Sequence, residues 1–343
     1  MPRNLRTVIL LSFLVLLHLA LLLPGFFAPY DFAQQNRDLP FAPPTRLHFI
    51  DATGAWHAWP FVHPLQPNVD GSDGYTEDVT QAYPLRLFVR GNAFQIVGPW
   101  NAHVHLFGVQ SPGHIFLFGT DDFGRDELSR ILFGGRISLF AGILGATAAL
   151  SVGALLGVLS GFYSGWTDAV IMRTSELFLA LPWLYLLFAV RAILPLRIKT
   201  TDAFLLFIVV VGLVAWARPA RLVRGIVLSA RERHFALAAR AMGASNFHVL
   251  RYHIFPETYG VLLTTAALLI PQFVLAEVTL SFLGLGVGEP IPTWGNLLIP
   301  MQKYSVLRSY WWLCLPAFAL VLLFLAYHWA STTVQEALGE VRS

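Results

Sequence analysis

Long apolar stretches recur along the whole chain and leave few ways for it to fold. A helix requires roughly 20 residues to cross a bilayer, and several stretches are about that long. Of the 343 residues, 56% are hydrophobic and only 13% are charged, whereas about a quarter of a soluble domain is charged. We expect an all-α integral membrane protein with six membrane-spanning helices, at residues 7–27, 137–163, 168–194, 203–223, 259–285 and 311–330. Pro182 and Pro271 are expected inside the third and fifth spans.

The first apolar run follows two basic residues, Arg3 and Arg6. A cleaved signal peptide has a similar pattern. Because further apolar runs follow, we favour an uncleaved N-terminal helix within residues 1–29, with its basic end in the cytoplasm.

The second run carries a small residue at every fourth position. Such a stripe lets two helices pack backbone to backbone in lipid. Its members are Ala141, Gly145, Ala149, Gly153, Gly157 and Gly161, and we take Gly145, Gly153 and Gly157 as helix-packing candidates.

A basic segment, residues 231–256, lies between two apolar runs and is predicted to form a short helical hairpin. Ser229 and Glu232 have capping-box spacing, so a helix is expected to begin there. Gly243 permits a turn, Ser245 can cap a second helix, and Pro256 is expected to end it. A basic amphipathic helix on anionic lipid is an alternative, and a DNA-reading helix-turn-helix is disfavoured because apolar spans flank the segment.

Charge gives the expected orientation. Residues 217–256 hold seven arginines and a single acid, which predicts a cytoplasmic loop. Counting spans from this loop places both termini in the cytoplasm and residues 30–118 outside. Arg191, Arg197 and Lys199 then fall on the outer side, against the rule.

Residues 30–118 form a different region, with no long apolar run and seven acids against four basic residues. We expect a small β-rich extracytoplasmic insert. One hairpin is predicted from residues 85–97 with a turn at Gly91-Asn92, and another from residues 47–62 around residues 51–54.

Histidines are the only candidate metal ligands in the insert, and His103 and His105 have the spacing of one strand face. Imidazole binds nickel, copper and zinc. No cysteine or fixed carboxylate spacing accompanies them, so we favour ordinary surface histidines and expect no metal site. His57, His63 and His114 also lie in the insert.

No catalytic or nucleotide-binding motif is present in the sequence. Neither Lys199 nor Lys303, the two lysines, fits a phosphate-binding loop. We therefore expect no enzyme and no cofactor bound by this chain. Cys314 is the single cysteine, which excludes an internal disulfide.

The basic segment resembles the cytoplasmic coupling loop of ATP-binding-cassette (ABC) importer permeases. That family's pattern is E-A-A, three residues, Gly, about ten residues, then I-x-P, and five residues match it: Ala238, Ala239, Gly243, Ile254 and Pro256. Leu237 stands where the family often has Glu, and Phe255 where it often has Leu. Glu232, which we include among the coupling-loop candidates, lies five residues before the vacant Glu position.

Longer strings resemble the peptide and nickel branch of the same family. Residues 119–139 read GTDDFGRDELSRILFGGRISL, close to the family signature G-T-D-x-x-G-R-D-x-x-S-R-x-x-x-G-x-R-x-S-L. Thr120 or Asp121 is expected to cap a helix there, with the charged residues at a membrane surface. Three further strings match, at residues 168–182, 277–287 and 291–296. The likeness covers residues 119–339, with departures at Ser331, Thr332 and Gln335.

Two acids within or beside predicted spans belong to these strings and are functional candidates by default. Glu176 lies one turn from Arg173, which favours a structural pair. Glu277 is a candidate for the pathway or for bracing a dimer, and we leave both open. Pro182 joins these pathway or packing candidates.

The resemblance implies the type I ABC importer permease fold, with residues 119–343 as the permease core. It also implies a second homologous permease, two ATP-binding subunits that bind ATP and Mg, and an extracytoplasmic solute-binding protein. The expected solute is a peptide. The protein is expected in the cell inner membrane, with no nucleic acid partner. A membrane-anchored binding or sensor protein and an ABC exporter are the alternatives. The insert is expected to dock the solute-binding protein or to cap the pathway; a passive stabilising domain is the alternative.

Overall fold

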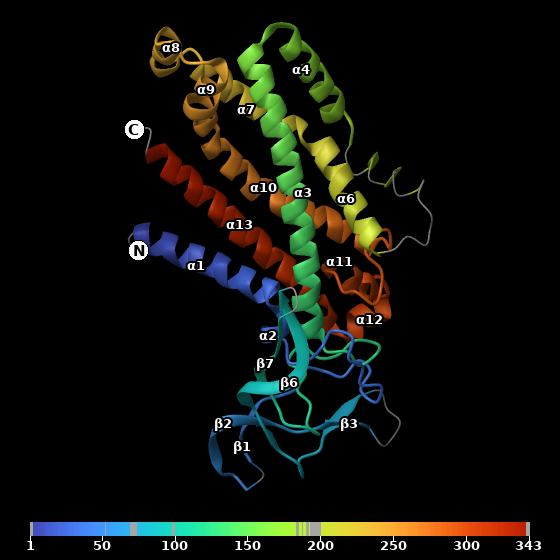
Figure 1. The fold of residues 1–343 in the computed structure, drawn as a ribbon. Coiled ribbons are helices and arrows are strands. Elements are labelled where there is room, and N and C mark those ends of the chain that lie inside the picture. The colour runs from blue at the N-terminus through green and yellow to red at the C-terminus, as the bar shows by residue number, and fades with distance from the viewer. Residues whose placement is uncertain are drawn as a thin grey trace. The chain divides into compact units, whose positions relative to one another are not determined.

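The computed structural model describes residues 3–51, 53–68, 74–97, 100–182, 185–186, 188–189, 192 and 200–340 (Figure 1). The chain divides into two compact units, which are described separately. The first comprises Met1–Leu14, Leu139–Leu280 and Leu323–Ser343, and the second comprises Val15–Ser138 and Ser281–Leu322. Helices that contribute residues to both units are α1 (Arg3–Leu22), α3 (Glu127–Tyr163), α10 (Tyr259–Phe282) and α13 (Leu315–Glu340).

The first unit is helical. Besides the parts of the helices just named, it contains α4 (Gly165–Ala180), α6 (Thr200–Ala215), α7 (Ala217–Ala230), α8 (His234–Ala241), α9 (Asn246–Val249), the π-helix η1 (Leu250–Ile254) and the 3₁₀ helix η2 (Phe255–Thr258). The α4 helix packs against α7. Apolar residues of α3, α7, α8, α9 and η1 form one core cluster, which includes Val158, Val223 and Val227.

Within the described residues, three helical segments are long and apolar enough to cross a membrane: Glu127–Tyr163, Asn246–Phe282 and Trp311–Glu336. Phe204–Ala215 and Ala217–Ala230 pass the same test as a pair, with a bend of 42° between them. The predicted span at residues 203–223 falls on this pair, in which the chain bends at Trp216 and α7 continues to Ala230. Val8–Leu22 is apolar but shorter.

Of the two prolines predicted inside spans, one lies within a helix and the other lies after a helix end. Pro271 lies inside α10, as predicted. The placement of Pro182 within a helix is wrong, because α4 ends at Ala180 and Leu181 has an extended backbone. A residue that precedes proline is biased away from the helical region, which accounts for this end. Most of the rest of that predicted span lies outside the described residues, as do Arg191, Arg197 and Lys199.

The second unit contains antiparallel strands in three sheets. Their order is β1-β2-β5, β3-β4 and β6-β7. The strands are β1 (His48–Ile50), β2 (Trp56–Val62), β3 (Leu65–Pro67), β4 (Tyr75–Glu77), β5 (Tyr83–Pro84), β6 (Arg86–Val97) and β7 (Trp100–Gly108). The predicted hairpin around residues 51–54 is confirmed, with Ile50 paired to Trp56.

The predicted turn at Gly91-Asn92 is wrong. Both residues lie within β6, which pairs with β7 and has a register shift between Arg90 and Phe94. Neither has the positive φ that a two-residue hairpin turn requires. The His105 ring occupies the space beside Gly91, and its nitrogens lie 2.7 Å from the Ala28 carbonyl oxygen and 3.1 Å from that of Asn92. The glycine therefore serves a β-bulge.

Short helices complete the second unit. They are α2 (Pro24–Phe27), α11 (Trp294–Leu297), η3 (Ile299–Gln302), α12 (Tyr304–Ser309) and η4 (Trp311–Cys314). Fully buried side chains include Phe116, Trp294 and Leu313.

Candidate functional site

The coupling hairpin, residues 234–254, contains α8 and the continuous α9–η1 segment, joined by a turn. Gly243 has φ +86°, a left-handed conformation that favours glycine. The Gly243 N–H donates to the Arg240 carbonyl and the Ala244 N–H to the Ala239 carbonyl, both at 3.0 Å, which is a Schellman motif. The Ser245 hydroxyl then accepts from the His248 N–H and caps α9, as predicted.

Both ends of this hairpin differ from the prediction. Ser229 does not begin a helix, because it lies in the last turn of α7 and its carbonyl accepts from the Glu232 N–H. The next helix begins at His234, and Glu232 is exposed in the intervening turn. Pro256 does not end a helix either: it lies at the start of η2, where a missing N–H is tolerated, and the chain stays helical from Asn246 to Phe282.

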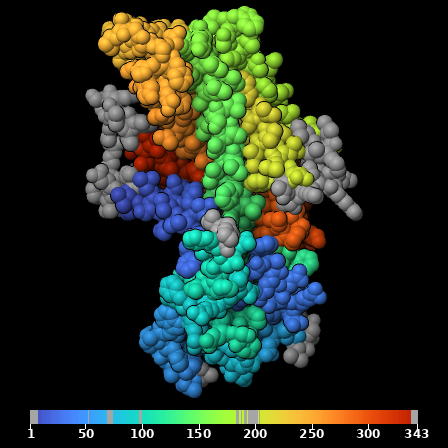
Figure 2. All heavy atoms as spheres, viewed as in Figure 1, coloured from blue at the N-terminus to red at the C-terminus, as the bar shows by residue number. Residues whose placement is uncertain are grey.

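The hairpin has an inner and an outer face. Ala236 and Ala239 are buried against Val249, Ile254 and the core of the first unit. The Cβ of Ala239, one of the motif residues, therefore faces the chain's own core. Exposed residues on the outer face include Leu237, Ala238, Met242, Phe247 and Tyr252. In Figure 2 the atoms of this hairpin (orange) lie uncovered on the face shown, beside the end of α3 (green).

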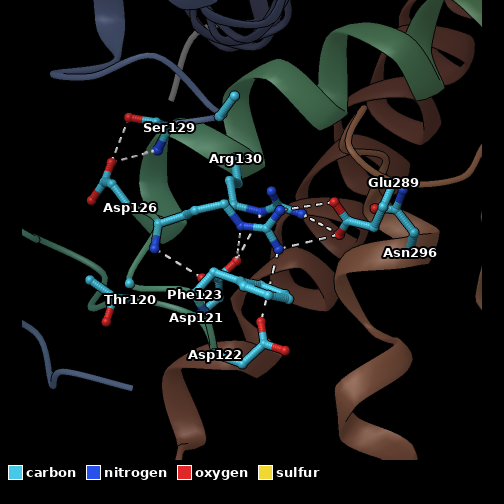
Figure 3. A network of polar contacts seen from close by, with 12 residues as sticks. Thr120, Asp121, Asp122, Phe123, Asp126, Ser129, Arg130, Glu289 and Asn296 are labelled. Atoms are coloured by element: carbon cyan, nitrogen blue, oxygen red, sulfur yellow. Dashed lines mark hydrogen bonds and ion pairs between the residues drawn. The ribbon is translucent and has the colours of Figure 1, made fainter. Parts of the chain in front are cut away.

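The GTDDFGRD string forms a buried polar network in the second unit (Figure 3). The Arg125 Nε atom donates to the Asp121 carboxylate at 2.6 Å, and its Nη1 donates to Glu289 at 2.9 Å. Arg130, only 1% exposed, donates from Nη2 to Glu289 at 2.8 Å, and its Nε lies 3.4 Å from Asp121. Arg125, Asp126 and Arg130 are buried within the protein.

A helix cap and one glycine fix the same string locally. Neither Thr120 nor Asp121 caps α3; instead Asp126 accepts from the Ser129 N–H at 2.8 Å and from its hydroxyl at 2.6 Å. Gly124 has φ +69° and lies so close to the Asn36 carbonyl that no Cβ could fit.

Burial raises the pKa of Asp126 from 3.8 to about 7, although the hydrogen bonds from Ser129 act to lower it. Burial, followed by the charge of Asp121, also raises the pKa of Asp122.

The segment at residues 291–296 packs against the start of α3 in the second unit. The Thr293 hydroxyl accepts from the Asn296 N–H, and the Asn296 side chain accepts from the Thr293 N–H, which is a complete capping box. Trp294 is fully buried and donates from Nε1 to the Ile131 carbonyl at 2.9 Å. A cavity of about 240 Å³ lies nearby, lined by Glu127, Arg130, Glu289 and Asn296 among others.

The remaining candidates are dispersed through the first unit. Glu176 is exposed on α4 and pairs with Arg173 at 3.1 Å, as the spacing predicts. Glu277 is buried in α10. A Cβ on Gly145 would lie 3.3 Å from the Phe273 ring. None of these residues or Pro182 lines the cavity between α4, α6, α7 and α10, whose walls include Phe178, Val211, Arg218, Gln272 and Phe273.

Three glycines of the small-residue stripe, here called the glycine stripe, lie against α7: Gly153, Gly157 and Gly161. A Cβ on Gly153 would lie 2.9 Å from the Trp216 carbonyl oxygen, and one on Gly157 would lie 2.5 Å from that of Ala220. Contacts this short leave room only for glycine, so the backbones of α3 and α7 touch.

Sequence reasoning missed two ion pairs, Asp168 with Arg224 and Glu289 with the buried arginines. Asp168 belongs to a matched string, whereas nothing local marks Glu289.

Of the two histidines predicted on one strand face, His103 is exposed and His105 is buried. Among the described residues, no three His, Cys, Asp or Glu side chains gather closely enough to hold a metal ion.

Several long apolar helices define an integral membrane protein as the class of this protein. Residues 153–338 match the family described as "Binding-protein-dependent transport system inner membrane component". The chain belongs to this family and is a multi-pass membrane permease.

Individual relatives carry similar descriptions. The chain is 34% identical, over 67% of its length and 73% of the relative's, to the dipeptide transport system permease protein DppC of Alkalihalophilus pseudofirmus. It is 37% identical to the oligopeptide transport system permease protein OppC of Haemophilus influenzae, over 64% and 69% of the two chains. It is 33% identical to DppC of Bacillus subtilis, over 64% and 67%.

Proposed function

We propose that this chain is one of two homologous permease subunits in an ATP-driven peptide importer. The observation that carries the proposal is the family match over residues 153–338, which includes the whole coupling hairpin. Peptide is the proposed solute because the relatives are described as dipeptide and oligopeptide permeases. ATP and Mg would bind to two partner subunits.

The outer face of the coupling hairpin supports a docking role toward an ATP-binding subunit. Leu237, Met242, Phe247 and Tyr252 are apolar or aromatic and exposed, with Met242 83% exposed. An amphipathic helix of this kind seats its apolar face in a groove of another protein. ATP binding would close the ATPase pair, displace the hairpins and switch the permeases between inward- and outward-facing states.

Six spanning helices and two cytoplasmic termini complete the proposal. The seven arginines of residues 217–256 support a cytoplasmic location for the hairpin. The excess of acidic over basic residues in 30–118 supports an outer location for the insert. Labelling with a membrane-impermeant maleimide tests this in a Cys314→Ser background. A cysteine in place of Thr53 should react in intact cells, and one in place of Ser245 should react only after lysis. The reverse pattern would reject the orientation.

The insert is proposed to dock the solute-binding protein. Trp56, Trp59 and Trp100 are all at least half exposed, and aromatic residues are common anchors at protein interfaces. Replacing residues 47–112 by a short flexible linker keeps Thr45, whose hydroxyl accepts from the Phe116 N–H at 2.9 Å. Binding of the solute-binding protein to the complex should weaken. Intact transport by the shortened chain would instead favour a passive stabilising domain.

Reconstitution of the whole complex tests the function directly. The chain, its homologous partner and the two ATP-binding subunits are placed in liposomes with the solute-binding protein. Uptake of di-, tri- and tetra-alanine is then measured with and without ATP. The proposal requires uptake that depends on both ATP and the binding protein. Efflux of the same peptides would indicate an exporter, and ATP-independent binding alone would indicate a sensor.

A further inference from the structure

A two-point ion pair joins α4 to α7 close to the coupling hairpin. The Arg224 guanidinium donates from Nε to one carboxylate oxygen of Asp168 at 2.5 Å and from Nη2 to the other at 2.6 Å. The Ser160 hydroxyl, at the end of α3, donates to the same carboxylate. The Asp168 side chain is only 18% exposed, so water screens the pair less than it screens a surface ion pair. A bidentate pair fixes orientation as well as distance.

Two further arginines reach the same corner between α3 and α4. Arg231, which directly follows α7, donates from Nη1 to the Gly161 carbonyl at 3.1 Å and to the Ser164 hydroxyl. Arg240 of α8 lies over the ring of Phe162, with 5.4 Å from its Cζ atom to the ring centroid. The basic residues that mark the cytoplasmic loop thus tie the hairpin and α7 to residues 160–168.

Backbone contact between α3 and α7 leads into this corner. A Cβ on Gly161 would lie 2.9 Å from the Arg224 carbonyl oxygen and 2.8 Å from the Val227 Cβ. The same α7 helix packs against η2, where the hairpin returns toward α10. Figure 1 shows α7 beside both α3 and α4. Apolar packing of Val158 with Val223 and Val227 is non-directional, so the polar contacts at residues 160–168 supply the directional restraint on sliding of α7 along α3.

We propose that Asp168 is a positioning residue that locks α7 to α3 and α4, so that displacement of the coupling hairpin moves the three helices together. Without the lock, part of the hairpin's displacement is lost as sliding of α7 over the glycine stripe. ATP hydrolysis then continues without moving the membrane helices in step. This inference rests on the proposed function, since it assigns a role in transmitting work from ATP-binding subunits.

The test uses the reconstituted whole complex and whichever alanine peptide the wild-type complex imports fastest. Asp168→Asn removes the charge, and Arg224→Lys keeps the charge but cannot make the two-point contact. Arg221→Lys is the matched control, because Arg221 is an exposed arginine of the same helix, one turn earlier. Three quantities are measured: complex assembly by pull-down, ATP hydrolysis, and the number of peptides imported per ATP hydrolysed.

We expect the imported peptide per ATP to fall about tenfold in Asp168→Asn and Arg224→Lys, a factor within the range for one charge-assisted hydrogen bond. Assembly and ATP hydrolysis should be retained, and Arg221→Lys should match the wild type. An unchanged ratio in Arg224→Lys overturns the inference. So does a parallel loss of assembly, hydrolysis and uptake, which indicates a purely structural pair. If Asp168→Asn does not insert, Arg224→Lys decides. Absence of ATP-driven uptake by the wild type rejects the proposed function instead.

Discussion

Arginine occupies two contrasting environments in this chain. In the second unit, Arg125 and Arg130 are buried and bound to Asp121 and Glu289. Around the coupling hairpin, seven arginines share a stretch with a single acid, and most are exposed. Arg231 lies 3.6 Å from that acid, Glu232. Arg224 and Arg233 pair with acids outside the stretch: Arg224 binds Asp168, and Arg233 binds Glu257 at 3.0 Å.

The difference separates two uses of the same side chain. A buried guanidinium has lost its hydration and depends on every carboxylate that surrounds it. An exposed one keeps its hydration, and its pairs contribute little to stability. The first group therefore holds a fold together, whereas the second leaves positive charge available for orientation in the membrane and for links between helices.

The largest expected effect comes from breaking the buried group. Arg130→Ala leaves the Asp121 and Glu289 carboxylates short of a counter-ion and should lower the free energy of unfolding by about 3–5 kcal/mol. Arg251→Ala, on the exposed hairpin beside Tyr252, should change it by less than about 0.5 kcal/mol. Denaturant unfolding of the purified protein in detergent measures both. Equal losses would mean that burial does not distinguish the two groups.

The two faces of the hairpin give the next test. Ala239→Glu places a charge in the core beside Val249 and Ile254 and should cost about 3 kcal/mol. Ala238→Glu places the same charge on the outer face and should leave folding intact. Under the proposed function, the Ala238 variant should still lose binding to the ATP-binding subunits in a pull-down. Equal unfolding curves for the two variants would contradict the assignment of faces.

Glycine packing offers a smaller effect. Gly153→Leu forces a side chain against the Trp216 carbonyl and should cost about 1–3 kcal/mol, with loss of the assembled complex. Gly225→Ala is the matched control on α7, since nothing lies within 4 Å of a Cβ there. It should gain up to about 1 kcal/mol from helix propensity. Thermal unfolding compares them, and a stable, assembled Gly153→Leu protein would argue against contact with α7.

Local sequence signals predicted elements well where the chemistry was itself local. The Gly243 turn, the Ser245 cap and the strand pair around residues 51–54 each depend on neighbouring residues. The predictions failed where a distant segment decides. Gly91-Asn92 has the composition of a turn, yet the His105 ring packs on it.

The polar site illustrates the same limit. Charge usually indicates exposure, yet Arg125, Asp126 and Arg130 are buried. Glu289, 159 residues beyond Arg130, supplies the carboxylate that allows burial. Likewise, Ala238 and Ala239 match one motif, but only packing against Ile254 determines which of them faces inward. Motifs identify residues that matter and leave their partners undetermined.

Among the buried polar residues of the second unit, Asp126 is the one whose substitution should change stability least. The pH dependence of the free energy of unfolding tests its burial. Its pKa is about 7 in the folded protein, against 3.8 in an unfolded chain. The folded state therefore binds the proton more tightly, so this group's contribution to stability is greatest below about pH 4 and falls as the pH rises toward 7.

Asp126→Asn should remove this part of the pH dependence at little cost near pH 4. The variant keeps the oxygen that accepts from the Ser129 N–H and hydroxyl, and its amide replaces the protonated oxygen. Unfolding of wild type and variant in detergent between pH 4 and pH 7 measures the difference. The curves should nearly coincide at the acidic end, with the variant more stable at pH 7. A constant difference across the range would mean that Asp126 does not titrate there, and that the buried group carries its charge throughout.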